Sequence, residues 1–152
     1  MNNFIKSIVL LSGWLVLSAT VNAETYTVKG VGIQFKPELV FANEGDVIAF
    51  RDMPTHFVDS IKIPVGAEKM ISKMGANYDY TITEPGIHLY KCPPHWGGRM
   101  GGLILVGIDL RNEEHLIDSL NEYRETVTDK IAKGYLKKVI KKIKAGKFKL
   151  PE

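Results

Sequence analysis

Residues 86–108 read GIHLYKCPPHWGGRMGGLILVGI, and the pattern of this stretch decides the fold. Two apolar and β-branched runs, GIHLYKC and GLILVGI, flank a loop that is rich in proline and glycine. Such runs, separated by turn residues, predict two β-strands joined by a loop. The run GLILVGI does not alternate between polar and apolar residues, so it predicts a strand buried on both faces.

Similar short runs precede this stretch at regular spacing. TYTVKG, ELVFA, DVIAF, FVDSIKI and NYDYTIT are separated by turn signals such as NEGD, DMPT and EPG. Seven or eight strands over about 85 residues is the spacing typical of an antiparallel sandwich with Greek-key connections. We therefore predict an all-β sandwich domain over residues 24–110.

Beyond residue 110 the apolar residues recur at helical spacing. Asn112 is a candidate N-cap, with Glu113 and Glu114 in the first turn, where negative charge suits the helix dipole. We predict one or two helices over 113–124 and 126–144, packed on the sandwich by their apolar stripe. Residues 111–152 thus form a C-terminal helical extension with a Lys-rich end. Its lysines are predicted to form a solvated face, with partner docking as the alternative: Lys137, Lys138, Lys141, Lys142, Lys144, Lys147 and Lys149.

Residues 1–23 have the pattern of a secretory signal peptide. Lys6 precedes the apolar run IVLLSGWLVLSA, and VNA ends the segment before Glu24 with small or apolar residues. A permanent membrane anchor is the weaker alternative, because the run falls short of the roughly 20 apolar residues that a spanning helix needs. We therefore predict export to the periplasm, cleavage after Ala23 and no stable membrane association. The formal net charge of +3 does not indicate nucleic-acid binding.

The only cysteine of the chain lies in the loop quoted above. An exported protein with one cysteine has no internal disulfide, and an exposed free thiol suits an oxidising compartment poorly. Cys92 is followed by His95 and Met100, so one loop supplies a thiol, an imidazole and a thioether. Two His, one Cys and a weak axial Met are typical of an electron-transfer copper centre, whereas structural zinc sites usually use more cysteines.

The second imidazole must come from elsewhere, and three histidines are candidates. His56, in RDMPTHFV, is the strongest, because it lies at the end of a predicted strand and can face a neighbouring loop. His88 precedes Cys92 by four residues in one predicted strand, which separates them by about 13 Å at about 3.3 Å per residue. This separation is too large for shared ligation. We interpret His88 as a core residue and His115 as a solvated residue of the first helix.

With these residues in place, the chain resembles the cupredoxins, the blue-copper family, and is most similar to the pseudoazurins. The resemblance extends over FKPELVFANEGDVIAF, SIKIPVGAEKMISKMGANYDYTITEPG, the loop, GLILVG and the helical tail. It implies that His56, Cys92, His95 and Met100 hold one copper ion that alternates between Cu(I) and Cu(II). It also implies a monomeric periplasmic carrier that shuttles single electrons between redox partners, such as a reductase, an oxidase or a cytochrome.

Two residues next to the ligands depart from the family pattern. Phe57 stands where cupredoxins commonly have Asn after the first histidine, and Pro93 where pseudoazurins commonly have Thr after the cysteine. We predict that Phe57 packs on Pro93 in place of a polar hydrogen bond between the loops. Pro93 and Pro94 have no backbone N–H to donate to the Cys92 sulfur, and they stiffen the path to His95.

Four residues are candidates for a surface that docks a redox partner around the exposed edge of His95. Met53, Pro94 and Trp96 would form an apolar patch, and Arg99 would belong to its basic rim. An ordinary packed aromatic is the alternative for Trp96.

The alternative function is a periplasmic copper chaperone or storage protein that does not cycle between redox states. A closed site of four ligands disfavours it, because delivery needs exposed ligands, and methionine- or histidine-rich tracts are absent. An enzyme is also disfavoured. No His-x-His pair is present to build a second copper site, and no open coordination position is implied.

Overall fold

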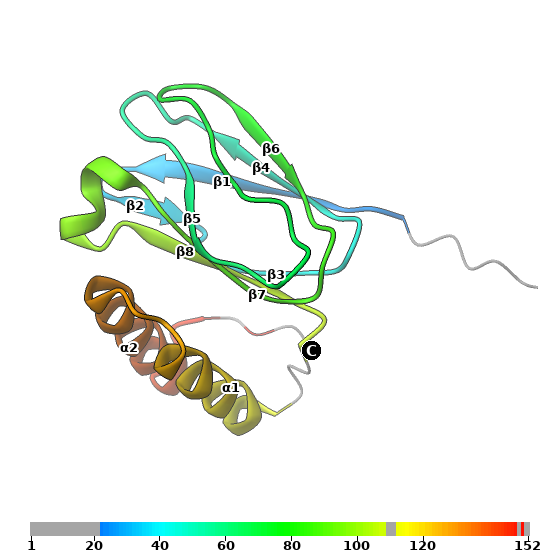
Figure 1. The fold of residues 1–152 in the computed structure, drawn as a ribbon, viewed down its shortest axis with the longest axis vertical. Helices are drawn as coiled ribbons and strands as arrows, with labels where there is room; N and C mark the ends of the chain where they lie inside the picture. Colours follow the sequence, from blue (N-terminus) through cyan, green and yellow to red (C-terminus); the bar gives the residue numbers. More distant parts are fainter. Residues whose placement is uncertain (1–21, 109–111, 149, 151–152) are drawn as a thin grey trace, which may run out of the picture.

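The computed structural model describes residues 22–108, 112–148 and 150. Within these ranges eight strands form two four-stranded sheets (Figure 1). They are β1 (Thr25–Val31), β2 (Gln34–Lys36), β3 (Leu39–Ala42), β4 (Val47–Arg51), β5 (Asp59–Lys62), β6 (Tyr78–Thr81), β7 (Gly86–Lys91) and β8 (Gly101–Val106). Residues 1–21 of the predicted signal peptide (1–23) lie outside the described residues.

The two sheets have the strand orders β2-β1-β4-β6 and β3-β8-β7-β5. The sequence predicted an antiparallel sandwich, but two of the strand pairs are parallel. These are the pairs of β1 with β4 and of β3 with β8. These parallel neighbours are not consecutive in the chain, which crosses from one sheet to the other between β2 and β3 and again between β3 and β4. The other strand pairs are antiparallel.

Strand β8 contributes to two cores at once. Ile104 and Val106 belong to the core between the two sheets, and Leu103 and Leu105 belong to the core beneath the helices. All six residues of β8 are buried, which confirms the prediction of a strand buried on both faces.

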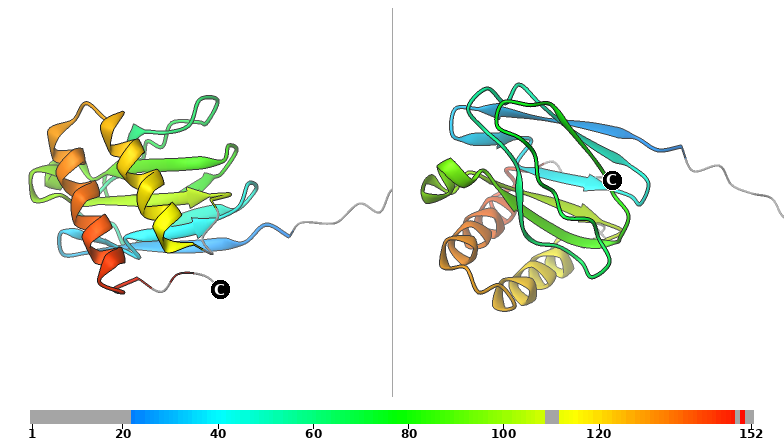
Figure 2. Two further views of the ribbon diagram at one scale, coloured as in Figure 1. Left: turned by 90° about the horizontal axis from the view of Figure 1, so that it is seen from below. Right: turned by 45° about the horizontal axis from the view of Figure 1, so that its top comes forward.

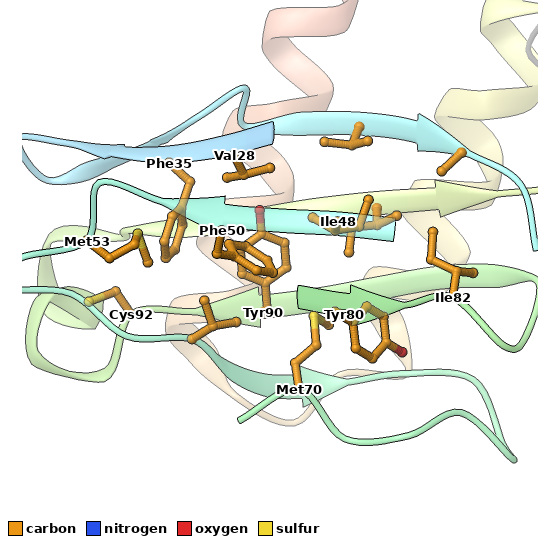
Figure 3. Packing of buried hydrophobic residues seen from close by; sticks show 14 of the residues in the cluster. Val28, Phe35, Ile48, Phe50, Met53, Met70, Tyr80, Ile82, Tyr90 and Cys92 are labelled. Carbon is orange, nitrogen blue, oxygen red and sulfur yellow. The ribbon is translucent and has the colours of Figure 1, made fainter. Parts of the chain in front are cut away.

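Aromatic rings fill the core between the sheets near the loop that follows β7 (Figure 3). The ring centroid of Tyr90 lies 5.1 Å from that of Phe35 and 5.2 Å from that of Phe50. The Tyr90 ring crosses the backbone of Gly102 in β8, where a Cβ atom would lie 2.2 Å from its hydroxyl oxygen. A glycine is therefore required at the start of β8.

Two helices, α1 (Glu113–Glu125) and α2 (Lys130–Lys144), cover the outer face of the sheet β3-β8-β7-β5 (Figures 1 and 2). Asn112 caps α1 as predicted, since its side chain accepts hydrogen bonds from backbone N–H groups of the first turn. Helix α2 begins later than predicted because Asp129 is its N-cap. Neither helix, nor any other in the described part of the chain, is long and apolar enough to cross a membrane.

Two lysines of α2 are part of the packing and not of the predicted solvated face. Lys138 Nζ lies 3.3 Å from Oε1 of Glu38, and Lys142 pairs with Oε2 of the same carboxylate. Glu38 lies just before β3 and its side chain is only 15% exposed, so the two ion pairs join α2 to the edge of the sheet. The other described lysines of this end are exposed as predicted, and Lys149 lies outside the described residues.

We expect Glu38→Gln to lower the free energy of unfolding by about 1–3 kcal/mol, because two partly buried ammonium groups lose their shared carboxylate. Urea denaturation followed by circular dichroism measures the change. Lys141→Gln is the matched control, since it removes an exposed charge of the same helix and should cost less than about 0.5 kcal/mol. Equal losses in the two variants would show that the Glu38 ion pairs contribute nothing specific.

His88 is a core residue, as interpreted from the sequence. It is fully buried, Nε2 donates to the Glu84 carbonyl at 2.9 Å, and Nδ1 lies 3.2 Å from the Tyr80 hydroxyl. Burial lowers the pKa of His88, and the hydrogen bond to Glu84 offsets this effect only in part. His115 is exposed, in agreement with its interpretation as a solvated residue.

The lowered pKa of His88 predicts that the metal-free protein loses stability in acid. As the pH falls below about 6.5, the unfolded state binds the proton before the folded state does. The free energy of unfolding therefore decreases, by up to about 1.4 kcal/mol per pH unit. Denaturation midpoints between pH 7.5 and pH 5.5 should show a smaller slope in His88→Gln than in the unaltered protein. An unchanged slope in His88→Gln would contradict this assignment.

Candidate metal centre

Three of the four predicted ligands converge at one end of the sandwich. His56 lies in the connection between β4 and β5, Cys92 directly follows β7, and His95 lies in the 3₁₀ turn η1 (Pro93–Gly98). Their donor atoms all lie within 4.8 Å of one another. Cys92 Sγ is 3.4 Å from His95 Nδ1 and 3.7 Å from His56 Nδ1, and the two Nδ1 atoms are 3.1 Å apart.

Backbone hydrogen bonds close the loop that holds Cys92, His95 and Met100. The N–H of Cys92 donates to the Met100 carbonyl at 2.9 Å, and the N–H of His95 donates to the Cys92 carbonyl at 3.0 Å. Arg99 makes the return with a left-handed φ of 61°, and its N–H donates to the Trp96 carbonyl. The three predicted ligands of the loop are therefore held by one compact turn.

The candidate ligands differ in their access to solvent. Cys92 and Met100 are fully buried, His56 is 5% exposed, and His95 is half-buried. Burial, with a smaller effect from His95, lowers the pKa of His56. The lowered pKa favours the neutral imidazole, which is the form that binds a metal. Met100 belongs to the same buried core cluster as Cys92, and its role as the fourth ligand stays a prediction.

This donor set suits copper better than other common metals. In the described part of the chain, His56, Cys92 and His95 form the only cluster of three or more His, Cys, Asp or Glu side chains that could hold a metal ion. The absence of a carboxylate from the cluster disfavours calcium and magnesium, and a single cysteine disfavours structural zinc. Two imidazoles and one thiol, with Met100 in the same loop as Cys92 and His95, fit an electron-transfer copper ion.

Gly30 of β1 lies directly beneath His56. A Cβ atom at this position would lie 2.6 Å from Cδ2 of His56 and 3.2 Å from Sδ of Met53. The imidazole and the thioether thus both pack on bare backbone. Sequence reasoning missed Gly30, although a glycine inside a predicted strand indicates close approach of another group.

The predicted docking patch is wrong for two of its four residues. Met53 is 2% exposed and packs beside His56, and Trp96 is 7% exposed with its indole against α2. Trp96 is therefore a packed aromatic, the alternative that the sequence left open. Pro94 and Arg99 are exposed.

Phe57, Pro93 and Pro94 lie next to the ligands in the chain. Phe57 and Pro93 are both partly exposed, and their contact stays a prediction. Among the described residues, the hydrogen-bonding partners of the Cys92 sulfur are the two imidazoles and no backbone N–H. This agrees with the lack of a backbone donor at both prolines.

Comparison with known sequences agrees with this site. A model of copper binding proteins of the plastocyanin/azurin family matches residues 21–107. Pseudoazurin of Paracoccus pantotrophus is 46% identical over 78 residues, which cover 48% of this chain and 52% of that protein. The plastocyanin minor isoform of Arabidopsis thaliana is 33% identical over 88 residues, which cover 58% of this chain and 50% of that protein. The chain thus spans about half the length of these curated relatives.

Solved structures of pseudoazurins share the fold over most of the chain. The pseudoazurin of Sinorhizobium meliloti has a TM-score of 0.61 at 27% identity and covers 81% of this chain and 98% of its own. The pseudoazurin of Methylobacterium extorquens AM1 has a TM-score of 0.62 at 28% identity and covers 78% and 98%. The two sheets therefore form a cupredoxin sandwich, and the shared part includes C-terminal helical structure.

Proposed function

The chain belongs to the plastocyanin/azurin family of copper-binding proteins, and from this premise we propose that it is a pseudoazurin-like blue-copper electron carrier. The observation that carries the proposal is the convergence of one buried thiol and two imidazoles within 4.8 Å. His56, Cys92, His95 and Met100 would hold one copper ion. On this proposal the chain transfers electrons and does not transform a substrate.

A bound copper ion would supply a centre that gains and loses one electron between Cu(II) and Cu(I). The chain's own residues keep the donors in place in both states. The loop is closed by backbone hydrogen bonds of Cys92 and His95, and Pro93 and Pro94 fix its first backbone angles. Burial of Cys92 and His56 keeps water from the donors. A stiff and dry set of ligands lowers the rearrangement that accompanies each electron transfer.

Electrons would enter and leave through the exposed edge of His95. Pro94 beside it is exposed, and so is Ile33 at 54%. Cδ1 of Ile33 lies 3.3 Å from the position of a Cβ at Gly98, so Ile33 borders the same loop. A docking face of Ile33, Pro94 and His95, with Arg99 at its rim, suits the small and transient encounters of redox proteins. Its partners would be a reductase, an oxidase or a cytochrome.

Export to the periplasm is part of the proposal, supported by the secretory pattern of residues 1–23 and by the pseudoazurin relatives. The mass of the protein recovered from the periplasm should correspond to a chain that begins at Glu24. Recovery of the uncleaved chain from the cytoplasm alone would contradict it.

A copper chaperone or storage protein is the competing function, and the burial of Cys92 and His56 disfavours it. Handover of a metal needs ligands that a recipient can reach, and here only His95 is partly exposed.

One experiment separates the two functions. The Cu(I)-loaded protein is mixed in parallel with a one-electron oxidant and with a strong Cu(I) chelator. We expect rapid oxidation with development of intense visible absorption, and much slower loss of copper to the chelator. Rapid transfer to the chelator, together with release of copper on oxidation, would identify a delivery protein.

A further inference from the structure

The residue that follows His95 is held by the helices as well as by the sandwich. Trp96 is the buried residue of η1. Its ring centroid lies 6.0 Å from that of Tyr135 in α2, and a Cβ at Gly101 would lie 2.9 Å from its Cζ3 atom. The indole is therefore enclosed between the start of β8 and helix α2.

Asp129 uses its two carboxylate oxygens for two different elements. Oδ1 accepts hydrogen bonds from the backbone N–H groups of Ile131 and Ala132, at 2.7 and 3.1 Å, and thus caps α2. Oδ2 accepts a hydrogen bond from Trp96 Nε1 at 2.9 Å. A single side chain therefore joins the first turn of α2 to the ligand loop.

A second contact supports the loop on the same helix. A Cβ at Gly134 would lie 3.3 Å from Nη2 of Arg99, so the guanidinium lies against the backbone of α2. Trp96 and Arg99 thus both touch the helix, at the two ends of the segment between His95 and Met100. By contrast, a Cβ at Gly97 would meet no atom within 4 Å.

We propose that Asp129 is a positioning residue for His95. Successive residues of a 3₁₀ turn point about 120° apart, so fixing the direction of Trp96 also fixes the direction of His95. The carboxylate of Asp129 would thereby hold the imidazole toward Cys92 before a metal binds. The functional consequence of this inference rests on the proposed copper centre, whereas the tie between Asp129 and Trp96 belongs to the metal-free chain.

Two variants break the tie, and a third is a matched control. Asp129→Asn keeps an oxygen that can cap α2, but its amide nitrogen cannot accept the indole N–H. Trp96→Phe keeps an aromatic ring and removes the donor. Asn112→Ala removes the N-cap of α1, and the side-chain hydrogen bonds that Asn112 makes with described residues stay within that helix. It measures the loss of a cap alone.

Amide hydrogen exchange of the metal-free protein is the primary measurement. The N–H groups of Arg99 and Met100 are bonded inside the loop and report its opening. We expect their exchange to become about tenfold faster in Asp129→Asn and Trp96→Phe, and less than about twofold faster in Asn112→Ala. In the copper-loaded protein, the visible absorption maximum and the reduction potential should shift in the first two variants and not in the control.

Loop exchange within about twofold of the original rate in both variants would overturn the proposal. So would equally faster exchange in the loop and in β4 of Asp129→Asn, because it would show a general loss of stability. An unchanged absorption maximum and potential despite a loosened loop would also overturn the positioning of His95. If the unaltered protein bound no copper, the proposed function would fail, while the exchange measurements would still decide whether Asp129 orders the loop.

Discussion

Cys92→Ser is expected to abolish the intense visible absorption of the copper-loaded protein and to leave it folded. The absorption of such centres arises from the thiolate bonded to Cu(II), and a serine hydroxyl is not a soft donor of this kind. Cys92 is fully buried, with its sulfur 3.4 Å from His95 Nδ1. We expect copper affinity to fall by more than about 100-fold. Titration with Cu(II) against a competing chelator, followed by absorption, measures both effects.

The fold of Cys92→Ser should survive, because the hydroxyl is slightly smaller than the thiol and can bond to the same imidazoles. The free energy of unfolding should fall by no more than about 1–2 kcal/mol. Met74→Leu, which removes the sulfur of a side chain that is 59% exposed, is the control and should keep the colour. Intense absorption in Cys92→Ser would exclude the thiol as a ligand. An unfolded metal-free variant would show that Cys92 is needed first for the core.

Gly30→Ala is expected to displace the His56 imidazole and thereby to weaken copper binding. The new methyl carbon would lie 2.6 Å from Cδ2 of His56, so the imidazole or β1 must move. Overpacking of this kind costs about 1–3 kcal/mol of stability. Displacement of a ligand that depends on its supporting contacts should lower copper affinity by about 10–100-fold. Equilibrium titration and urea denaturation measure the two effects.

Gly97→Ala is the matched control for Gly30→Ala. Gly97 lies in η1, two residues after His95, yet a Cβ there would meet no atom within 4 Å. Copper affinity should therefore change by less than about threefold. If the two variants bound copper equally well, the packing of His56 on β1 would not matter for the site.

The candidate site could be predicted because most of its chemistry is local in the sequence. Cys92, His95 and Met100 occupy one loop between two strand patterns, and a lone cysteine in a chain with a secretory pattern demands an explanation. The apolar run of β8 likewise predicted burial on both faces without knowledge of what covers it. The three residues of β2 were missed, since a strand of this length between turns gives too short a pattern.

Contacts between distant segments could not be predicted from local patterns. Trp96 is buried by a helix whose cap lies 33 residues further along the chain. The Lys142 ammonium donates a hydrogen bond to a carboxylate 104 positions away, that of Glu38. Asp129 is different, because an N-cap residue before an amphipathic run is a local signal, and reading it would have placed the start of α2 correctly.

Voltammetry of the Cu(II)-loaded protein, with its visible absorption recorded at each potential, is the most direct test of the central claim. The claim is that the chain carries one electron on one copper ion. We expect a reversible couple of one electron per copper, with absorption that is lost on reduction and fully restored on reoxidation over repeated cycles. An irreversible response, with copper released on reduction or with no intense absorption in the Cu(II) form, would contradict an electron carrier built on His56, Cys92, His95 and Met100.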